Sequence, residues 1–324
     1  MAENWTERPS LNVKRAGLAT ATIGERIYAI GGFGPGFASR DSVEVRDPDE
    51  VWQPVVPMLT ARGNLGAAAV NDQIYVFGGE TDHGSTKLAE VLTSANEPIP
   101  KWEPIAKLPN RLTAPGTAAF NGKIYLIGGS TGGNVTGKVH VYDPVPDKWS
   151  SEAAPMPTRR WFLRVTQVGG WLYAIGGANK GGQFLDTVER YNPENDIWED
   201  VAPMGTPRGG PGVVTVNDRI YVVGGAGGVF GPDHVPLTSS EVFAEAPQPA
   251  WQPLEAVFPV GRSSLRAERA PGNQILAIGG FEPRPEPEPG SDPSNLVEAL
   301  KILARIQPVP AGHGWIDCDR GESY

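Results

Sequence analysis

The chain has very few of the residues from which metal and redox sites are built. Among its 324 residues there is one cysteine, Cys318, so no internal disulfide is possible, which is in keeping with a reducing compartment. The four histidines are spread along the sequence, whereas a transition-metal site needs three or four converging ligands. We therefore expect no metal and no cofactor. The sequence also shows no Ser-His-Asp spacing and no Gly-Lys phosphate-binding motif.

Long apolar runs and an excess of positive charge are also absent. No apolar run approaches the roughly 18 residues of a membrane helix, and the opening stretch MAENWTERPS lacks the features of a signal peptide. We therefore expect a cytoplasmic protein that binds no membrane. The 28 Lys and Arg residues against 37 Asp and Glu residues give a net charge of −9, which would repel nucleic acid as a main partner.

What the sequence does contain is a repeated motif, an apolar run that ends in Gly-Gly. Its recurrence with a period close to fifty residues indicates a repeat architecture. The six copies are IYAIGG at 27–32, IYVFGG at 74–79, IYLIGG at 124–129, LYAIGG at 172–177, IYVVGG at 220–225 and ILAIGG at 275–280.

Each repeat has four segments with the character of a β-strand. A small-residue segment, such as RGNLGAAAVN, precedes the apolar run, which is too short for a helix and rich in β-branched and aromatic residues. A third segment, such as DTVERYNP, ends in turn chemistry, and a fourth carries a tryptophan, as in IWEDVAPM. Four short antiparallel strands in about fifty residues predict one propeller blade.

The Gly-Gly pair, the tyrosine in the second strand and the tryptophan on the fourth strand together resemble the kelch repeat. The resemblance covers about residues 3 to 306, with Leu276 in place of the tyrosine in the last copy. It implies an all-β fold, a six-bladed β-propeller of kelch type with four antiparallel strands per blade around a central channel. We expect residues 1–307 to form this single propeller and residues 308–324 to be a polar tail.

Counting tryptophans suggests how the ring closes. Six Gly-Gly pairs match six fourth-strand tryptophans only if Trp5 belongs to the last blade. We therefore predict that residues 4–10 form the outer strand of blade six, so that no strand edge is left bare. Trp315 is the alternative, but it lies 18 residues after Val297, whereas earlier repeats place the tryptophan about ten residues after the matching position.

An arginine opens the first strand of every repeat. We expect these side chains to surround one mouth of the channel. Because arginine binds carboxylates and phosphates through paired hydrogen bonds, they predict a site for an anionic ligand or an acidic peptide. The alternative is that several of them brace neighbouring loops. The six residues are Arg15, Arg62, Arg111, Arg160, Arg208 and Arg262.

Two repeats depart from the small residues that this first strand otherwise carries. The fourth copy has Arg164 where the others have alanine or glycine, and it has Trp161 and Phe162 just before it. In the sixth copy we align Ala267 with Arg164, and Arg266 and Glu268 then flank that position. These side chains form either a specific pocket or a plug in the channel.

Two functions follow. The first is a binding protein that presents the arginine-rich face to a protein or a small anionic ligand. The second, implied by the resemblance to kelch propellers that isomerise or open anionic sugars, is a cofactor-free isomerase or lyase. In it Arg164 would hold a carboxylate and Glu268 would move a proton. The fold alone cannot separate the two.

Overall fold

The computed structural model describes residues 5–48, 51–93, 100–150, 153–231, 234–245 and 249–282. Strands make up nearly all of the regular structure in these ranges, and the two helical segments are single 3-10 turns at Pro35–Phe37 and Pro271–Asn273. Neither these nor any other helix of the described ranges is long and apolar enough to cross a membrane.

The strands form antiparallel sheets that follow one another along the chain. The predicted all-β architecture of four-stranded blades is confirmed, but the described residues contain five such blades and not six. The sixth position holds a two-stranded sheet, β27–β28. The inner strands are β1 (Ala19–Ile23), β5 (Gly66–Val70), β11 (Gly116–Phe120), β17 (Arg164–Val168), β21 (Gly212–Val216) and β27 (Arg266–Ala270).

The Gly-Gly motifs end the second strand of each unit, as the sequence predicts, and all of these strands pair with the inner strands. They are β2 (Arg26–Ile30), β6 (Gln73–Phe77), β12 (Lys123–Ile127), β18 (Trp171–Ile175), β22 (Arg219–Val223) and β28 (Gln274–Ile278). The third strands are β3 (Val43–Arg46), β9 (Ala89–Leu92), β15 (Val139–Asp143), β19 (Val188–Asn192) and β25 (Ser240–Ala244). The outer strands are β4 (Gln53–Val55), β10 (Trp102–Pro104), β16 (Lys148–Ser150), β20 (Ile197–Val201) and β26 (Ala250–Pro253).

Short ribbons extend three of the blades at the end where the second strand stops. They lie between the second and third strands, on the same edge of the ring as the start of the inner strands, because the two strands are antiparallel. They are β7–β8 (Glu80–Thr81 and Gly84–Ser85), β13–β14 (Ser130–Thr131 and Asn134–Val135) and β23–β24 (Ala226–Gly227 and Val235–Pro236).

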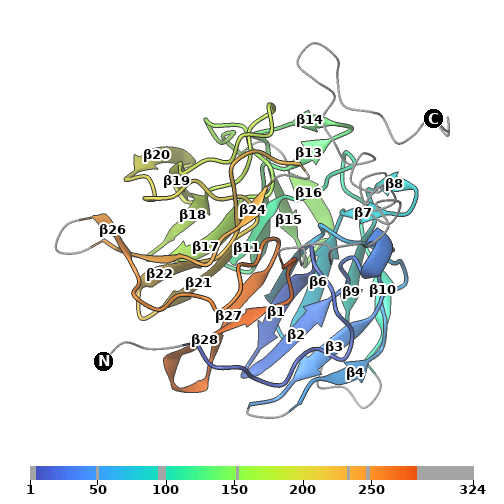
Figure 1. Cartoon of the computed structure of the whole chain (residues 1–324). Coiled ribbons are helices and arrows are strands. Elements are labelled where there is room, and N and C mark those ends of the chain that lie inside the picture. The colour runs from blue at the N-terminus through green and yellow to red at the C-terminus, as the bar shows by residue number, and fades with distance from the viewer. Residues whose placement is uncertain are drawn as a thin grey trace, which may run out of the picture.

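The sheets fan outward from a centre at which the inner strands meet (Figure 1). Each inner strand contacts the next in chain order, and β27 packs between β21 and β1, so the last described strands return to the first. Apolar side chains of neighbouring sheets fill the space between them. Tyr28 and Ile30 of blade one, for example, share a core cluster with Ile74 and Val76 of blade two.

The predicted outer strand over residues 4–10 is not observed, because residues 5–10 form no strand. The segment nevertheless lies against the sixth position. The ring of Trp5 stacks on Phe258 with centroids 4.2 Å apart, and Arg8 donates a hydrogen bond to Gln274 of β28. The third strand expected near Val297, the alternative closer Trp315 and the predicted tail at 308–324 lie outside the described residues.

Backbone hydrogen bonds run from blade to blade around the axis, just before the inner strands begin. In every unit the residue two before the inner strand has a positive φ, and in blades one to five its amide donates to the matching carbonyl of the preceding unit. A bulky residue rarely adopts this conformation, yet Phe162 does, with φ +54. The bonds join Gly17 to Ser264, Asn64 to Gly17, Ala114 to Asn64, Phe162 to Ala114 and Gly210 to Phe162.

The Gly-Gly pair is required by a close approach between neighbouring blades. Gly176 has φ +59, and a Cβ there would lie 2.5 Å from the backbone oxygen of Arg208 in the next blade. Gly177 has φ +103 and donates its amide to that same oxygen at 2.8 Å. Any side chain at Gly176 would therefore force the two blades apart.

We expect Gly176→Ala to lower the free energy of unfolding by well over 1 kcal/mol, because it combines the cost of a left-handed alanine, about 1 kcal/mol, with a clash. Gly169→Ala is the matched control, since Gly169 has φ +53 but a Cβ there would meet nothing within 4 Å. Urea unfolding of both variants measures the difference. Equal losses in the two variants would contradict a role for the close approach.

Candidate functional site

Four of the six arginines predicted at a channel mouth are instead buried within their own blades. Each is at most 4% exposed and forms an ion pair of 2.6 to 2.8 Å with a buried glutamate of the third strand. Other guanidinium donors reach backbone carbonyls, as where Arg208 binds the oxygens of Gly224 and Ser239, although within the described residues the Nε atoms of Arg62 and Arg208 have no hydrogen-bond partner. The pairs are Arg15–Glu44, Arg62–Glu90, Arg160–Glu189 and Arg208–Glu241.

These glutamates are the partners that the sequence analysis missed. In each case the carboxylate also accepts a backbone amide from the loop that leads into the arginine, as in the bond from Thr158 to Glu189 at 3.0 Å. Burial lowers the pKa of Arg160 to about 10, and the charge of Glu189 opposes this shift. The four arginines therefore brace the blades, which is the alternative that the sequence left open.

In blade three the described residues contain no such buried pair, and the arginine that the sequence analysis assigned to this position, Arg111, lies one residue before it. Leu112, fully buried, occupies the place of the buried arginine, because its carbonyl accepts the amide of Gly79 as that of Arg62 accepts the amide of Gly32. His140 replaces the glutamate, is 2% exposed, and has a pKa that burial and then Lys138 lower.

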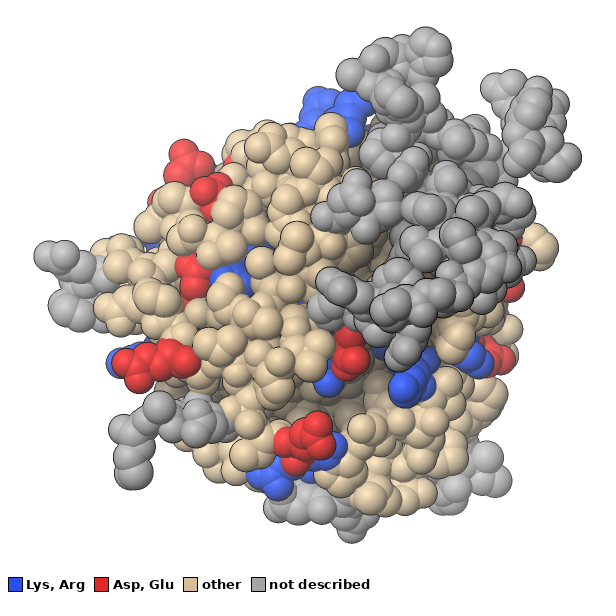
Figure 2. All heavy atoms as spheres, viewed as in Figure 1, with Lys and Arg blue, Asp and Glu red and all other residues tan. Residues whose placement is uncertain are grey.

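Arg111 therefore precedes the buried position and is exposed, with a hydrogen bond from its Nη1 to the carbonyl of Ser85 at 3.0 Å. Arg262 of the sixth position is partly exposed and pairs with Glu282 at 3.2 Å. On the face seen in Figure 2, outside the grey atoms, Lys and Arg occur in small groups beside Asp and Glu, and no continuous basic surface is visible.

Trp161 and Phe162 do not line an open pocket. They are 4% and 7% exposed, and their rings pack on each other with centroids 4.4 Å apart. Phe230 from blade five covers both, at 5.0 Å and 5.3 Å. Phe184 belongs to the same cluster. The aromatic pair therefore joins blades four and five at the rim.

Arg164 and Arg266 both open an inner strand, and they occupy equivalent positions. Arg164 pairs in register with Ile175 and Arg266 with Ile278, so the predicted alignment of Ala267 with Arg164 is wrong by one residue. The cause is the 3-10 turn at Pro271–Asn273, which adds a residue between β27 and β28.

The two guanidinium groups reach across the end of the ring. Arg164 Nη2 donates to the carbonyl of Leu265, two units further on, and Arg266 Nη2 donates to that of Leu65 at 3.4 Å, again two units on. Both side chains remain partly exposed. Burial, reinforced by the charge of Arg266, lowers the pKa of Arg164 well below its usual range. Two like charges thus share a poorly solvated site.

Glu268 lies near Arg266 but is not the hydrogen-bonding partner of Arg164. Its carboxylate accepts the hydroxyl of Thr22 from blade one at 2.9 Å. Burial raises its pKa, while Thr20, Thr22 and the charge of Arg266 oppose the shift. Among the described residues, Arg164 Nε and Arg266 Nη1 have no hydrogen-bond partner.

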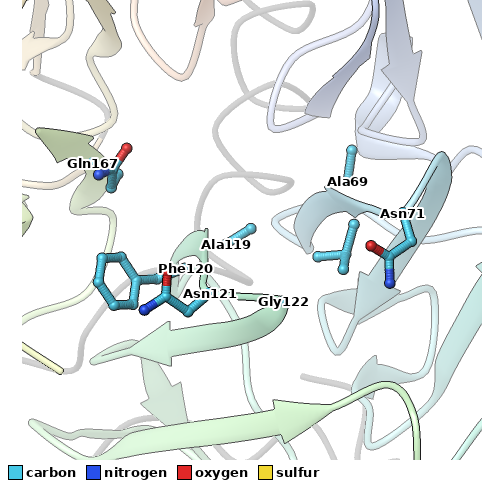
Figure 3. Close-up of a pocket in the computed structure, with 8 residues that line it drawn as sticks. Ala69, Asn71, Ala119, Phe120, Asn121, Gly122 and Gln167 are labelled. Atoms are coloured by element: carbon cyan, nitrogen blue, oxygen red, sulfur yellow. The ribbon is translucent and has the colours of Figure 1, made fainter. Parts of the chain in front are cut away.

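A pocket without charged lining residues lies at the opposite end of the inner strands. It has a volume of about 340 Å³ and lies where the inner strands of blades two, three and four end, and Asn71, Asn121, Gln167 and Phe120 are among its lining residues (Figure 3). No charged side chain lines it. Elsewhere in the described ranges no three His, Cys, Asp or Glu side chains are grouped so as to hold a metal ion.

Comparison with known proteins gives a consistent assignment. A family model of the KLHDC2/KLHL20/DRC7 Kelch-repeats domain matches residues 17–225. Kelch-like protein 23 of Homo sapiens is 32% identical over 218 residues, which is 66% of this chain and 38% of that protein. Beta-scruin of Limulus polyphemus is 25% identical over 297 residues, 86% of this chain and 26% of that protein. The chain thus spans well under half the length of these relatives.

A solved structure, described as "Structure of YjhT", has a TM-score of 0.71 at 18% sequence identity. The match covers 85% of this chain and 93% of that one. At this level of identity the likeness shows a shared fold and nothing about activity.

We expect Arg160→Ala and Glu189→Ala each to lower the free energy of unfolding by about 3–5 kcal/mol, because either change strands a buried charge. The double variant should lose less free energy of unfolding than the sum of the two single variants, since neither charge remains.

Blade three offers the reverse experiment. Leu112→Arg and His140→Glu should each destabilise, and together they should recover part of the loss. Urea unfolding measures these free energies. If the change in each double variant equalled the sum of the changes in its two single variants, in blade four and in blade three, the assigned pairs would be contradicted.

Proposed function

The chain belongs to the kelch-repeat family, and from this premise we propose that it is a binding protein that holds an acidic segment of a partner protein at the arginine-bearing end of the ring. The observation that carries the proposal is the pair Arg164 and Arg266. They are two partly exposed residues at equivalent positions, and their guanidinium groups reach across the end of the ring to carbonyls of other units.

The residues that the structure describes offer these two arginines little compensation. Their hydrogen bonds reach carbonyl oxygens, and within that part of the chain the carboxylate near Arg266, that of Glu268, accepts a hydrogen bond from Thr22. Bringing like charges together with so few anions is costly, so a carboxylate supplied by a ligand would be stabilised there by charge-assisted hydrogen bonds.

An acidic segment fits the site better than a large acidic surface does. The net charge of −9 opposes the approach of a strongly negative partner. The attraction is therefore local, within about one Debye length of the arginines, or about 8 Å at physiological ionic strength. A small anionic ligand would satisfy the same chemistry, and the two are separated by titrating peptides and small carboxylates in parallel.

A second candidate function, proton transfer on a carboxylated sugar, rests on Glu268. Burial raises the pKa of this carboxyl, and a raised pKa suits a general acid or base. It lies beside Arg266, which would orient the carboxylate of such a substrate. Incubation with carboxylated sugars in D2O would show deuterium incorporation that depends on Glu268 if this were the activity.

We also propose that the N-terminal segment completes the sixth blade and thereby positions Arg266. Trp5 packs against the core cluster shared by blade five and the sixth position, and Arg8 contacts β28. The amides of Gly17 and Gly280 join blade one to the sixth position, through the carbonyls of Ser264 and Arg15.

We expect Arg164→Ala and Arg266→Ala to leave the stability of the free protein unchanged or raised, because each removes like-charge repulsion. The parent should gain thermal stability on titration with a hexaglutamate peptide, in proportion to occupancy, and both variants should lose this gain. Arg269→Ala is the control, since Arg269 is exposed and binds Asn273 on the same strand unit. Destabilisation by Arg164→Ala, with no anion shifting the Tm of the parent, would sink the proposal.

Deletion of residues 1–10 should lower the Tm strongly and abolish the hexaglutamate effect. Full burial of a tryptophan contributes up to about 4–6 kcal/mol, of which the partly buried Trp5 supplies a share. Removal of residues 310–324 should have little effect on either measurement. The closure proposal fails if that C-terminal truncation proves the more damaging of the two.

A further inference from the structure

The backbone hydrogen bonds that link the units around the axis are interrupted at one place. Five of them join the residues that lie two before the inner strands, from Gly17 around to Gly210. Ser264 holds this position in the last unit and also has a positive φ, of +55. The sixth bond would run from its amide to the carbonyl of Gly210, and within the ranges that the structure describes it is not formed. The ring therefore has a gap between blade five and the sixth position.

The gap leaves one backbone donor and one backbone acceptor unpaired in the described part of the chain. The amide of Ser264 donates to no acceptor there, and the carbonyl of Gly210 accepts no hydrogen. The two residues are nevertheless neighbours, because a Cβ on Gly210 would lie 3.2 Å from the nitrogen and from the Cα of Ser264. Gly210 is buried and Ser264 is partly exposed. Poorly solvated backbone groups are nearly always paired in native proteins, with protein, water or ligand.

The Ser264 side of the gap is fixed by the residue before it. Ser263 is 1% exposed and exchanges backbone hydrogen bonds with Phe281. Its hydroxyl lies 3.1 Å from Nε2 of His234, and Nδ1 of that ring lies 2.7 Å from the carbonyl of Gly231. Because a carbonyl only accepts, Nδ1 carries the proton, and Nε2 of the neutral ring accepts from the serine. A donor held in this way loses little entropy when it binds a ligand.

The gap lies beside the two arginines of the proposed site. Arg164 Nη2 donates to the carbonyl of Leu265 at 3.2 Å, and Leu265 stands between Ser264 and Arg266 in the sequence. One guanidinium thus contacts the residue that follows Ser264, and the other belongs to the residue after that. The unpaired amide and both cationic side chains therefore meet at one short segment of the mouth.

We propose that the gap and the two arginines together bind an extended peptide. Its backbone lies at Ser264 and Gly210, and a carboxylate side chain of the same segment lies at Arg164 and Arg266. This inference rests on the proposed function and narrows it to a peptide. A peptide group has one donor and one acceptor, which are the two groups that would complete the gap. A small carboxylate offers only acceptors and would leave the carbonyl of Gly210 unpaired.

The test uses a fluorescein-labelled peptide of the sequence Gly-Gly-Glu-Glu-Gly-Gly, whose binding to the full chain is measured by anisotropy. A series of analogues replaces one amide at a time by an ester, which removes the N–H group without adding bulk. We expect an ester beside a glutamate to weaken binding by roughly threefold to tenfold, the scale of one hydrogen bond. Esters at the terminal glycines should have no effect.

The matching change in the protein is an amide-to-ester replacement at residue 264, introduced with an α-hydroxy acid. It should weaken binding of the unmodified peptide by a similar factor. Ser264→Gly should not, because glycine keeps the N–H group and readily adopts the positive φ. The same ester at Gly122 is the control, since Gly122 is exposed in the turn between β11 and β12 and its amide also lacks an acceptor among the described residues. Thermal unfolding confirms that each protein is folded.

The possible results separate this inference from the proposed function. If the unmodified peptide binds and Arg164→Ala weakens its binding, but neither the ligand esters nor the ester at residue 264 has an effect, only the role of the gap is overturned. No binding by the parent would overturn both proposals. Displacement of the peptide by an equal concentration of glutarate would identify a small carboxylate as the ligand and would also overturn the inference.

Discussion

The packing of each blade against its neighbour depends on one backbone contact, the bond from the second glycine of a Gly-Gly pair to the carbonyl at the start of the next repeat. Where that carbonyl belongs to a buried arginine, the arginine makes two kinds of contact. Its backbone oxygen binds the preceding blade, as Arg208 binds Gly177, and its side chain binds its own glutamate and strand ends. Inter-blade packing and the internal order of a blade are therefore coupled through single residues.

Much of this architecture follows from the sequence, because the features responsible recur. Gly-Gly pairs at strand ends, tyrosines in the second strand and tryptophans in the outer strand mark positions where backbone conformation or core volume allows few alternatives. The indole nitrogens confirm the spacing. Trp102 donates to the carbonyl of Val56, and Trp149 to that of Ala106, each bridging to the preceding blade.

The candidate site was harder to predict because it depends on single-residue shifts. The sequence analysis assigned the same role to an arginine in every repeat, yet Arg111 lies one position before the buried arginines. Arg266, in turn, occupies a position that holds alanine or glycine in four of the six repeats. A signal for the buried arginines was present, since a glutamate recurs as the second residue of third strands such as that of Glu189. Blade three has His140 in place of this glutamate, and it is the blade in which the buried arginine is replaced by Leu112.

Because the inner strands form a closed ring, only some parts of the chain can tolerate insertions or deletions. An open stack of repeats can gain or lose a unit at its end, but here the amide of Gly17 reaches the carbonyl of Ser264, so the inner circumference admits only a fixed set of contacts. The extra residue between β27 and β28 is accordingly absorbed in a turn beyond the strands. Insertions that create new binding specificities are therefore confined to the loops outside the ring of inner strands. The inner strands themselves can change only by substitution of residues.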